Sequence, residues 1–268
     1  ILGGAYEYGI VADTLIQNGH TETNFAVKHF AYSGGGGGTD ENIDIDGSGD
    51  GAIPIYVGDV VHKLRITSGT VVPVDLFVTQ KDIDSGKIST EEASAHVEKI
   101  PTSQSRINSY VQSLINKGAS SSSSMAGKTT IKPVIDGTPA IDTTGMDDGI
   151  TIYVDCSNIT LSNSGWIIRK KPNQSIVFNI PGTDVHIDKF YVYEYRNGQF
   201  DEGVPSTTSA LNGTPEINQK VDDVIFKHIT FNAYQADTVR IVDASGLLLA
   251  PNASYVSQIN GAGWIVTG

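Results

Sequence analysis

Short clusters of β-branched and aromatic residues, separated by Gly, Asn, Asp or Ser, run through most of the 268-residue chain. They fill residues 1–80 and 128–268 and recur roughly every eight to twelve residues in the second segment, a spacing typical of sandwiches, barrels and solenoids. Examples are Ile55–Val57, Leu76–Val78, Ile150–Val154 and Ile176–Ile180. No exact repeat is visible, which excludes a solenoid with a strict motif but leaves an irregular one open.

Residues 89–118 change to a helical pattern. Ser89 followed by Glu92 matches a capping box and predicts a short helix over 90–99. A second helix, over 102–117, is predicted from one apolar stripe at helical spacing: Ile107, Tyr110, Val111, Leu114 and Ile115. Thr102 is its expected cap, Gly118 its expected C′ residue, and the serine run 120–124 a surface loop.

The charge and the cysteine content of the chain exclude several classes of binding partner and an internal disulfide. The 18 basic and 30 acidic residues give a net charge of −12, which disfavours nucleic acid and anionic membranes because phosphate binding needs a basic face. No apolar run approaches the roughly 18 residues that span a bilayer. The one cysteine, Cys156, allows no internal disulfide, and we expect it to be a small buried residue. The start at Ile1 without Met is typical of a segment taken from a longer protein.

The stretch 190–196 alternates in a way that suits a strand with two different faces. Period two places Tyr191, Tyr193 and Tyr195 on one face, opposite Phe190, Val192, Glu194 and Arg196. A row of tyrosines can form a platform that stacks against a sugar or a peptide. It can also be a packing ridge beneath the helix of residues 102–117. Both interpretations stay open at the level of sequence.

The acidic stretch around residues 44–51 is similar to the start of a calcium loop. Asp44, Asp46, Ser48 and Asp50 place oxygens at alternate positions with glycine between, which suits a hard cation. The twelfth position, where a full loop carries a bidentate Glu, is Ile55. The alternative is a solvated acidic loop beside the run of five glycines that ends at Gly38.

Catalytic patterns are weak. The six histidines show no metal-ligand spacing, and phosphate loops and nucleophile elbows are absent. Two pairs of adjacent aspartates could serve a glycosidase or lyase: Asp147 with Asp148, and Asp222 with Asp223. However, neighbours on a strand point to opposite faces, and such pairs are common in turns. Adjacent threonines face opposite ways too, which argues against an ice-binding plane: Thr129–Thr130, Thr143–Thr144 and Thr207–Thr208.

Two ends of the chain resemble one family. Residues 2–13 with 24–27, and residues 246–253 with 260–266, are similar to the opening and ending of choice-of-anchor A, ice-binding-like adhesive domains. The segments Leu-Ala-Pro-Asn-Ala at 249–253 and Gly-Trp-Ile-Val at 263–266 are the most specific. The resemblance implies a right-handed β-solenoid with a helix laid along it. It also implies a place on a Gram-positive bacterial surface, with a cell-wall anchor outside this chain.

We therefore predict a mostly β fold: an irregular right-handed β-solenoid with one amphipathic helix packed along it, or alternatively a β-sandwich. Residues 1–268 would form a single adhesive domain of three segments: 1–80, 89–118 and 128–268. The expected function is non-covalent, non-enzymatic binding of a surface protein or glycan by a monomeric domain, without nucleic acid or membrane insertion. Calcium, at the acidic stretch around residues 44–51, is the only cofactor that the sequence predicts. A carbohydrate-active β-helix enzyme and a structural spacer are the alternatives.

Overall fold

The computed structural model describes residues 7–17, 19–32, 42–45, 51–67, 69–90, 93, 96–133, 140–206, 219–259 and 263–268. The chain divides into two compact units, Ile1–Lys117 and Gly118–Gly268. This division falls inside the long helix α2 (Gln104–Met125), so each unit contains one part of that helix. The single-domain interpretation of residues 1–268 stays a prediction.

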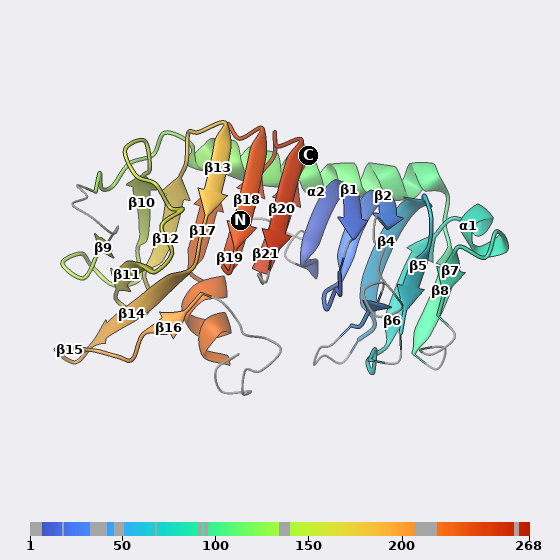
Figure 1. The fold of residues 1–268 in the computed structure, drawn as a ribbon, viewed down its shortest axis with the longest axis horizontal. Helices are drawn as coiled ribbons and strands as arrows, with labels where there is room; N and C mark the ends of the chain where they lie inside the picture. Colours follow the sequence, from blue (N-terminus) through green and yellow to red (C-terminus); the bar gives the residue numbers. More distant parts are fainter. Residues whose placement is uncertain are drawn as a thin grey trace. The chain divides into compact units, whose positions relative to one another are not determined.

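In the first unit, the chain alternates between two parallel sheets (Figure 1). The larger sheet contains, in spatial order, β1 (Ile10–Gln17), β2 (Phe25–Tyr32), β4 (Ile53–Val60), β6 (Val74–Val78) and β8 (Val97–Pro101). The smaller contains β3 (Asn42–Ile43), β5 (Leu64–Ile66) and β7 (Ile88–Ser89), and the short helix α1 (Gln80–Asp84) follows β6. Alternate residues such as Val74, Leu76 and Val78 are buried and build the core of this unit.

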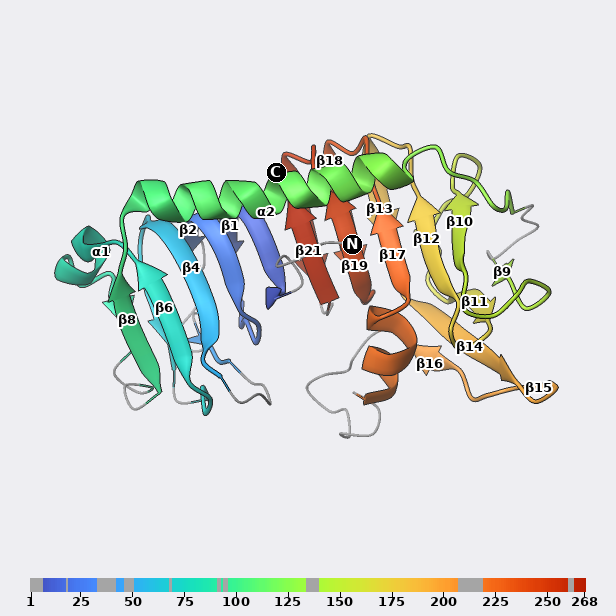
Figure 2. The ribbon, with the colours of Figure 1, turned by 180° about the vertical axis from the view of Figure 1, so that it is seen from behind.

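Helix α2 packs its predicted apolar stripe into the first unit, where Figure 2 shows it crossing the strands of the larger sheet near one end. Ile107, Val111 and Leu114 are fully buried, as the 3.6-residue period predicts. Tyr110 lies beside Tyr8, and their hydroxyl oxygens are 3.1 Å apart. The predicted helix over 90–99 is wrong, because Val97–Pro101 forms strand β8 and pairs with β6.

In the second unit, three sheets carry mostly parallel strands. The first holds β10 (Thr151–Asp155), β12 (Ser175–Asn179), β17 (Ile229–Asn232), β19 (Gly246–Ala250) and β21 (Gly263–Thr267). The second holds β9 (Ala140–Asp142), β11 (Trp166–Lys170), β14 (Phe190–Arg196), β15 (Gln199–Phe200) and β16 (Val204–Pro205). The third holds β13 (Asp184–Ile187), β18 (Thr238–Val242) and β20 (Tyr255–Ile259), and a π-helical turn spans Asp222–Phe226.

The core of the second unit is built around aromatic rings. Trp166 is fully buried, with its ring centroid 5.4 Å from that of Phe178 and 4.7 Å from that of Phe190. Phe231 stacks on Phe178 at 5.4 Å. Cys156 is buried in this core, as predicted, and burial raises the pKa of its thiol. The fold is therefore mostly β, and its parallel pairing differs from the antiparallel pairing of a β-sandwich.

The serine run is helical rather than a loop, because α2 continues to Met125. Gly118 is therefore not a C′ residue. A Cβ built on it would lie 2.4 Å from Cγ1 of Val266, so glycine allows the helix to approach strand β21 closely.

A buried asparagine ladder meets the helical serines. Asn179 and Asn232 are register partners on β12 and β17, and Nδ2 of Asn232 donates to Oδ1 of Asn179 at 2.8 Å. The hydroxyl of Ser122 donates to Oδ1 of Asn232 at 2.6 Å. Polar side chains thus anchor this part of the helix, where an apolar stripe is absent.

Candidate functional site

The three candidate tyrosines lie together on the outer face of strand β14. Tyr191, Tyr193 and Tyr195 are half-buried, whereas Phe190, Val192 and Glu194 between them are buried. The alternation predicted from the sequence is therefore confirmed. Because Phe190 and Val192 pack into the aromatic core of the second unit, the strand has little freedom to rotate.

Neighbouring strands extend this face. On β11, Ile167 pairs in register with Tyr191, and Arg169 pairs with Tyr193. On the opposite edge, Tyr195 pairs with Phe200 of β15 and Tyr191 with Pro205 of β16. Register partners in a sheet present their side chains to the same side. We call the following set the tyrosine face: Ile167, Arg169, Tyr191, Tyr193, Tyr195, Phe200 and Pro205.

Close contacts fix the aromatic rings of the tyrosine face. The ring of Tyr193 packs against Gly203, where an added Cβ would come within 2.6 Å of Cε1 and Cζ. Tyr195 and Phe200 have ring centroids 5.1 Å apart at an interplanar angle of 60°. The Phe200 side chain is nevertheless 44% exposed. The rings are thus held in place while part of their surface stays open to solvent.

Two cations border the rings. Nζ of Lys189 lies 5.3 Å from the ring centroid of Tyr191, and Cζ of Arg169 lies 5.7 Å from that of Phe200. Both distances fall in the range of cation–π attraction. Among the residues that the structure describes, neither Arg169 nor Lys189 forms an ion pair with a carboxylate. By contrast, Arg196 pairs with Asp201 at 3.0 Å.

A buried ion pair supports the tyrosine face from below. Nζ of Lys170 lies 2.7 Å from Oε1 of Glu194, its register partner on β14, and both side chains are buried. Nζ also donates to the carbonyl of Pro172 at 2.8 Å. Burial lowers the pKa of Lys170, and the bond to Glu194 opposes that shift. The pair joins β11 to β14 and so holds Arg169 beside Tyr193.

One comparison with known proteins identifies the family. The family model described as "Putative Ice-binding-like adhesive domain" matches residues 1–266. The chain belongs to this family. The resemblance to ice-binding-like adhesive domains is thereby confirmed, whereas the choice-of-anchor A subtype and the Gram-positive source stay predictions. No curated protein and no solved structure matches the chain.

The family assignment suits a domain that works at a surface. In the described part of the adhesive domain, none of the helices has the length and apolar character needed to cross a bilayer. A cell-wall anchor stays a prediction.

Of the four residues in the predicted calcium loop, the structure describes only Asp44. Asp46, Ser48 and Asp50 lie outside the described residues. The carboxylate of Asp44 accepts a hydrogen bond from the Thr67 hydroxyl and lies 3.5 Å from Nε2 of His20. No cluster of three or more His, Cys, Asp or Glu side chains that could hold a metal occurs among the described residues. Calcium binding at this loop stays a prediction.

The two aspartate pairs serve local structure in the adhesive domain. Oδ1 of Asp148 accepts from the backbone N–H of Asn173 at 2.9 Å, and Oδ2 accepts from its side chain at 2.9 Å. Asp223 accepts from Lys227 at 2.6 Å, four residues away. Within the described ranges, no hydrogen bond or ion pair links one aspartate pair to the other.

The threonine pairs are likewise engaged locally, where they are described. Thr143 is buried and its hydroxyl lies 2.8 Å from Oε1 of Gln174, while the hydroxyl of Thr144 donates to Asp142 at 2.6 Å. Thr129 and Thr130 are exposed. Thr207 and Thr208 lie outside the described residues.

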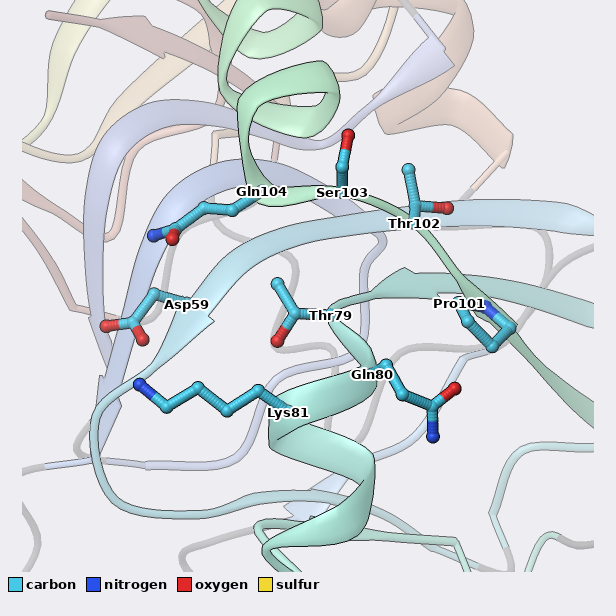
Figure 3. A pocket seen from close by; sticks show the side chains of 8 residues that line it. All are labelled: Asp59, Thr79, Gln80, Lys81, Pro101, Thr102, Ser103 and Gln104. Atoms are coloured by element: carbon cyan, nitrogen blue, oxygen red, sulfur yellow. The ribbon is translucent and has the colours of Figure 1, made fainter.

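The first unit contains an open cavity of about 410 Å³ between the start of α1 and the start of α2 (Figure 3). It is lined by Asp59, Thr79, Gln80, Lys81, Pro101, Thr102, Ser103 and Gln104. Lysine and glutamine side chains at its border are exposed. Small-molecule sites are usually enclosed clefts that bury most of the ligand, so this open cavity does not resemble one.

Sequence reasoning missed Arg169, Lys189 and Phe200. Arg169 lies beside Tyr193 only because β11 and β14 pair in a particular register, and no local pattern reveals that register. On β11, the buried residues Trp166, Ile168 and Lys170 alternate with Ile167 and Arg169. This alternation predicts that Ile167 and Arg169 face outward.

Proposed function

We propose that this chain is an adhesive domain that binds an extracellular ligand non-covalently through its tyrosine face and catalyses no reaction. The ligand would be a protein or a glycan on a host or environmental surface. The bacterial surface, reached through a cell-wall anchor outside this chain, is the proposed location. The observation that carries the proposal is the tyrosine face: aromatic side chains from β14 and β15 that are fixed from below and partly open to solvent.

The geometry favours surface binding over catalysis. Flat, rigid aromatic groups supply contact area at a low cost in conformational entropy. A glycosidase would need carboxylates that converge on a substrate, whereas Asp148 accepts hydrogen bonds from Asn173 and Asp223 accepts one from Lys227.

We further infer that each unit is a stack of several turns of an irregular β-solenoid. In both units, successive strands pass from one sheet to another and return beside the previous strand in parallel. Stacked coils of this kind present long sheet faces, and such a face is the kind of surface that an adhesive domain requires.

A binding screen tests the proposal. The purified domain is applied to immobilised extracellular-matrix proteins and to a glycan array. We expect a saturable interaction that weakens at least tenfold in Tyr193→Ala. The matched control is Tyr255→Ala, which removes a tyrosine that is 62% exposed on β20 of the same unit.

The outcomes separate the alternatives. Equal loss of binding in both variants, or loss in neither, would move the binding site away from the tyrosine face. Saturable binding to no protein or glycan would favour a structural spacer. Conversion of an array glycan into a smaller product would favour the carbohydrate-active enzyme.

A further inference from the structure

We propose that the tyrosine face selects acidic glycans, polysaccharides whose sugar rings carry carboxylate or sulfate groups. This inference rests on the proposed function and names its ligand class. Two observations carry this inference: a stacking surface, and two cations at its border that form no ion pair with a carboxylate among the described residues.

The stacking surface suits a sugar ring. Cε1 and Cζ of Tyr193 pack against Gly203, and the Tyr193 side chain is half-buried, so part of it stays open to a ligand. Tyr195 and Phe200 continue the apolar surface on the same side of the sheet. The C–H groups of a pyranose ring can pack on such rings, while its hydroxyls stay in water.

Arg169 supplies the acidic specificity. It is the register partner of Tyr193, and adjacent strands lie about 4.8 Å apart, so its guanidinium is within reach of a substituent on a sugar that stacks on Tyr193. A guanidinium binds carboxylate and sulfate in a bidentate manner. Asp142, next to Arg169 on β9, already accepts hydrogen bonds from the backbone N–H and the hydroxyl of Thr144.

Lys189 adds a second cation beside Tyr191, at the other end of the row. Arg196, by contrast, bonds to both Glu194 and Asp201. Arg169 and Lys189 are thus positive groups at the border of the tyrosine face that a ligand can engage without displacing an ion pair that the structure describes.

The net charge of the chain opposes the binding of an acidic polymer, so the local contacts of the tyrosine face must overcome it. At −12, the whole-chain field repels an acidic polymer and attracts a basic one. An acidic glycan would therefore be retained only through local, short-range contacts. Such contacts weaken as salt increases, and their loss on mutation should be confined to the cations involved.

The test uses one polymer in two charge states. Polygalacturonic acid and its fully methyl-esterified form share a backbone but differ in charge, and heparin serves as a sulfated probe. We expect the domain to bind the acid form at least tenfold more tightly than the ester. We expect the affinity for the acid form or for heparin to fall by at least tenfold in Arg169→Gln and to decrease between 50 and 500 mM NaCl. Arg240→Gln, which neutralises an exposed arginine on β18, is the matched control and should bind like the parent.

Each outcome is decisive. Equal binding of acid and ester, or unchanged binding in Arg169→Gln, overturns the acidic specificity. If Tyr193→Ala still abolishes binding in that case, the proposed function survives. Binding to a matrix protein alone overturns the glycan assignment and keeps adhesion. A urea midpoint within about 0.3 M of the parent confirms that each variant is folded.

Discussion

Asn232→Ala should destabilise the second unit strongly, because Asn232 links a sheet to helix α2 through buried hydrogen bonds. Its substitution removes an acceptor from the Ser122 hydroxyl at 2.6 Å and a donor from Oδ1 of Asn179 at 2.8 Å. The carbonyl of Ser122 keeps the N–H of Ala126 as a partner at 2.9 Å. Two buried polar groups are thus left without a partner, at about 1–3 kcal/mol each. We expect a total loss of about 3 kcal/mol.

Urea unfolding measured by tryptophan fluorescence is the assay. Both tryptophans, Trp166 and Trp264, lie in the second unit, so the signal reports on that unit. With a slope of about 2 kcal/mol per M, the midpoint should fall by about 1.5 M. The control is Asn252→Ala, which removes an exposed hydrogen bond to the carbonyl of Tyr234 and should shift the midpoint by less than about 0.3 M. Equal shifts in the two variants would refute the claim that the asparagine ladder anchors the helix.

Three other contacts of the second unit lead to predictions. Lys170→Met should lower the free energy of unfolding in urea by about 3–5 kcal/mol, because it leaves Glu194 buried without its lysine. The double variant with Glu194→Leu should recover most of that loss. A single variant as stable as the double would contradict this. Gly118→Ala should lower stability by about 1–3 kcal/mol despite the better helix propensity of Ala, because its Cβ would collide with Val266, and the penalty should shrink in a Val266→Ala background. The backbone N–H of Ser157 donates to the Asp155 carboxylate and lowers the pKa of that carboxyl below the unfolded value of about 3.9. The ionised Asp155 therefore stabilises the fold above that pH, and this contribution is lost as the pH falls through the folded pKa. Asp155→Asn should therefore reduce the urea midpoint at pH 7 and converge with the parent near pH 2, whereas a constant difference across that range would contradict the assignment.

The predictable parts of the fold are those with strong local periodicity. The stripe of Ile107, Val111 and Leu114 is buried as its spacing predicts, and the tyrosines of β14 face outward as period two predicts. In both cases, one face of a single element carries all the information, and the neighbouring elements need not be known.

The errors arise where a distant partner decides the structure. The capping-box pattern at Ser89 favours a helix locally, but pairing of Val97–Pro101 with β6 makes that segment a strand. The serine run has no apolar period, yet it is helical because Ser122 bonds to Asn232, 110 residues away. Arg169 joined the candidate site for the same reason, through the register of β11 with β14.

The central claim, that the tyrosine face is the adhesive surface, can be tested without mutation. Hydroxyl-radical footprinting would compare the free domain with the domain saturated by a glycan or protein that it binds. We expect protection at Tyr193, Tyr195 and Phe200, with unchanged labelling at Tyr255. Protection at Tyr255 or in the first unit, with full labelling of the tyrosine face, would contradict it.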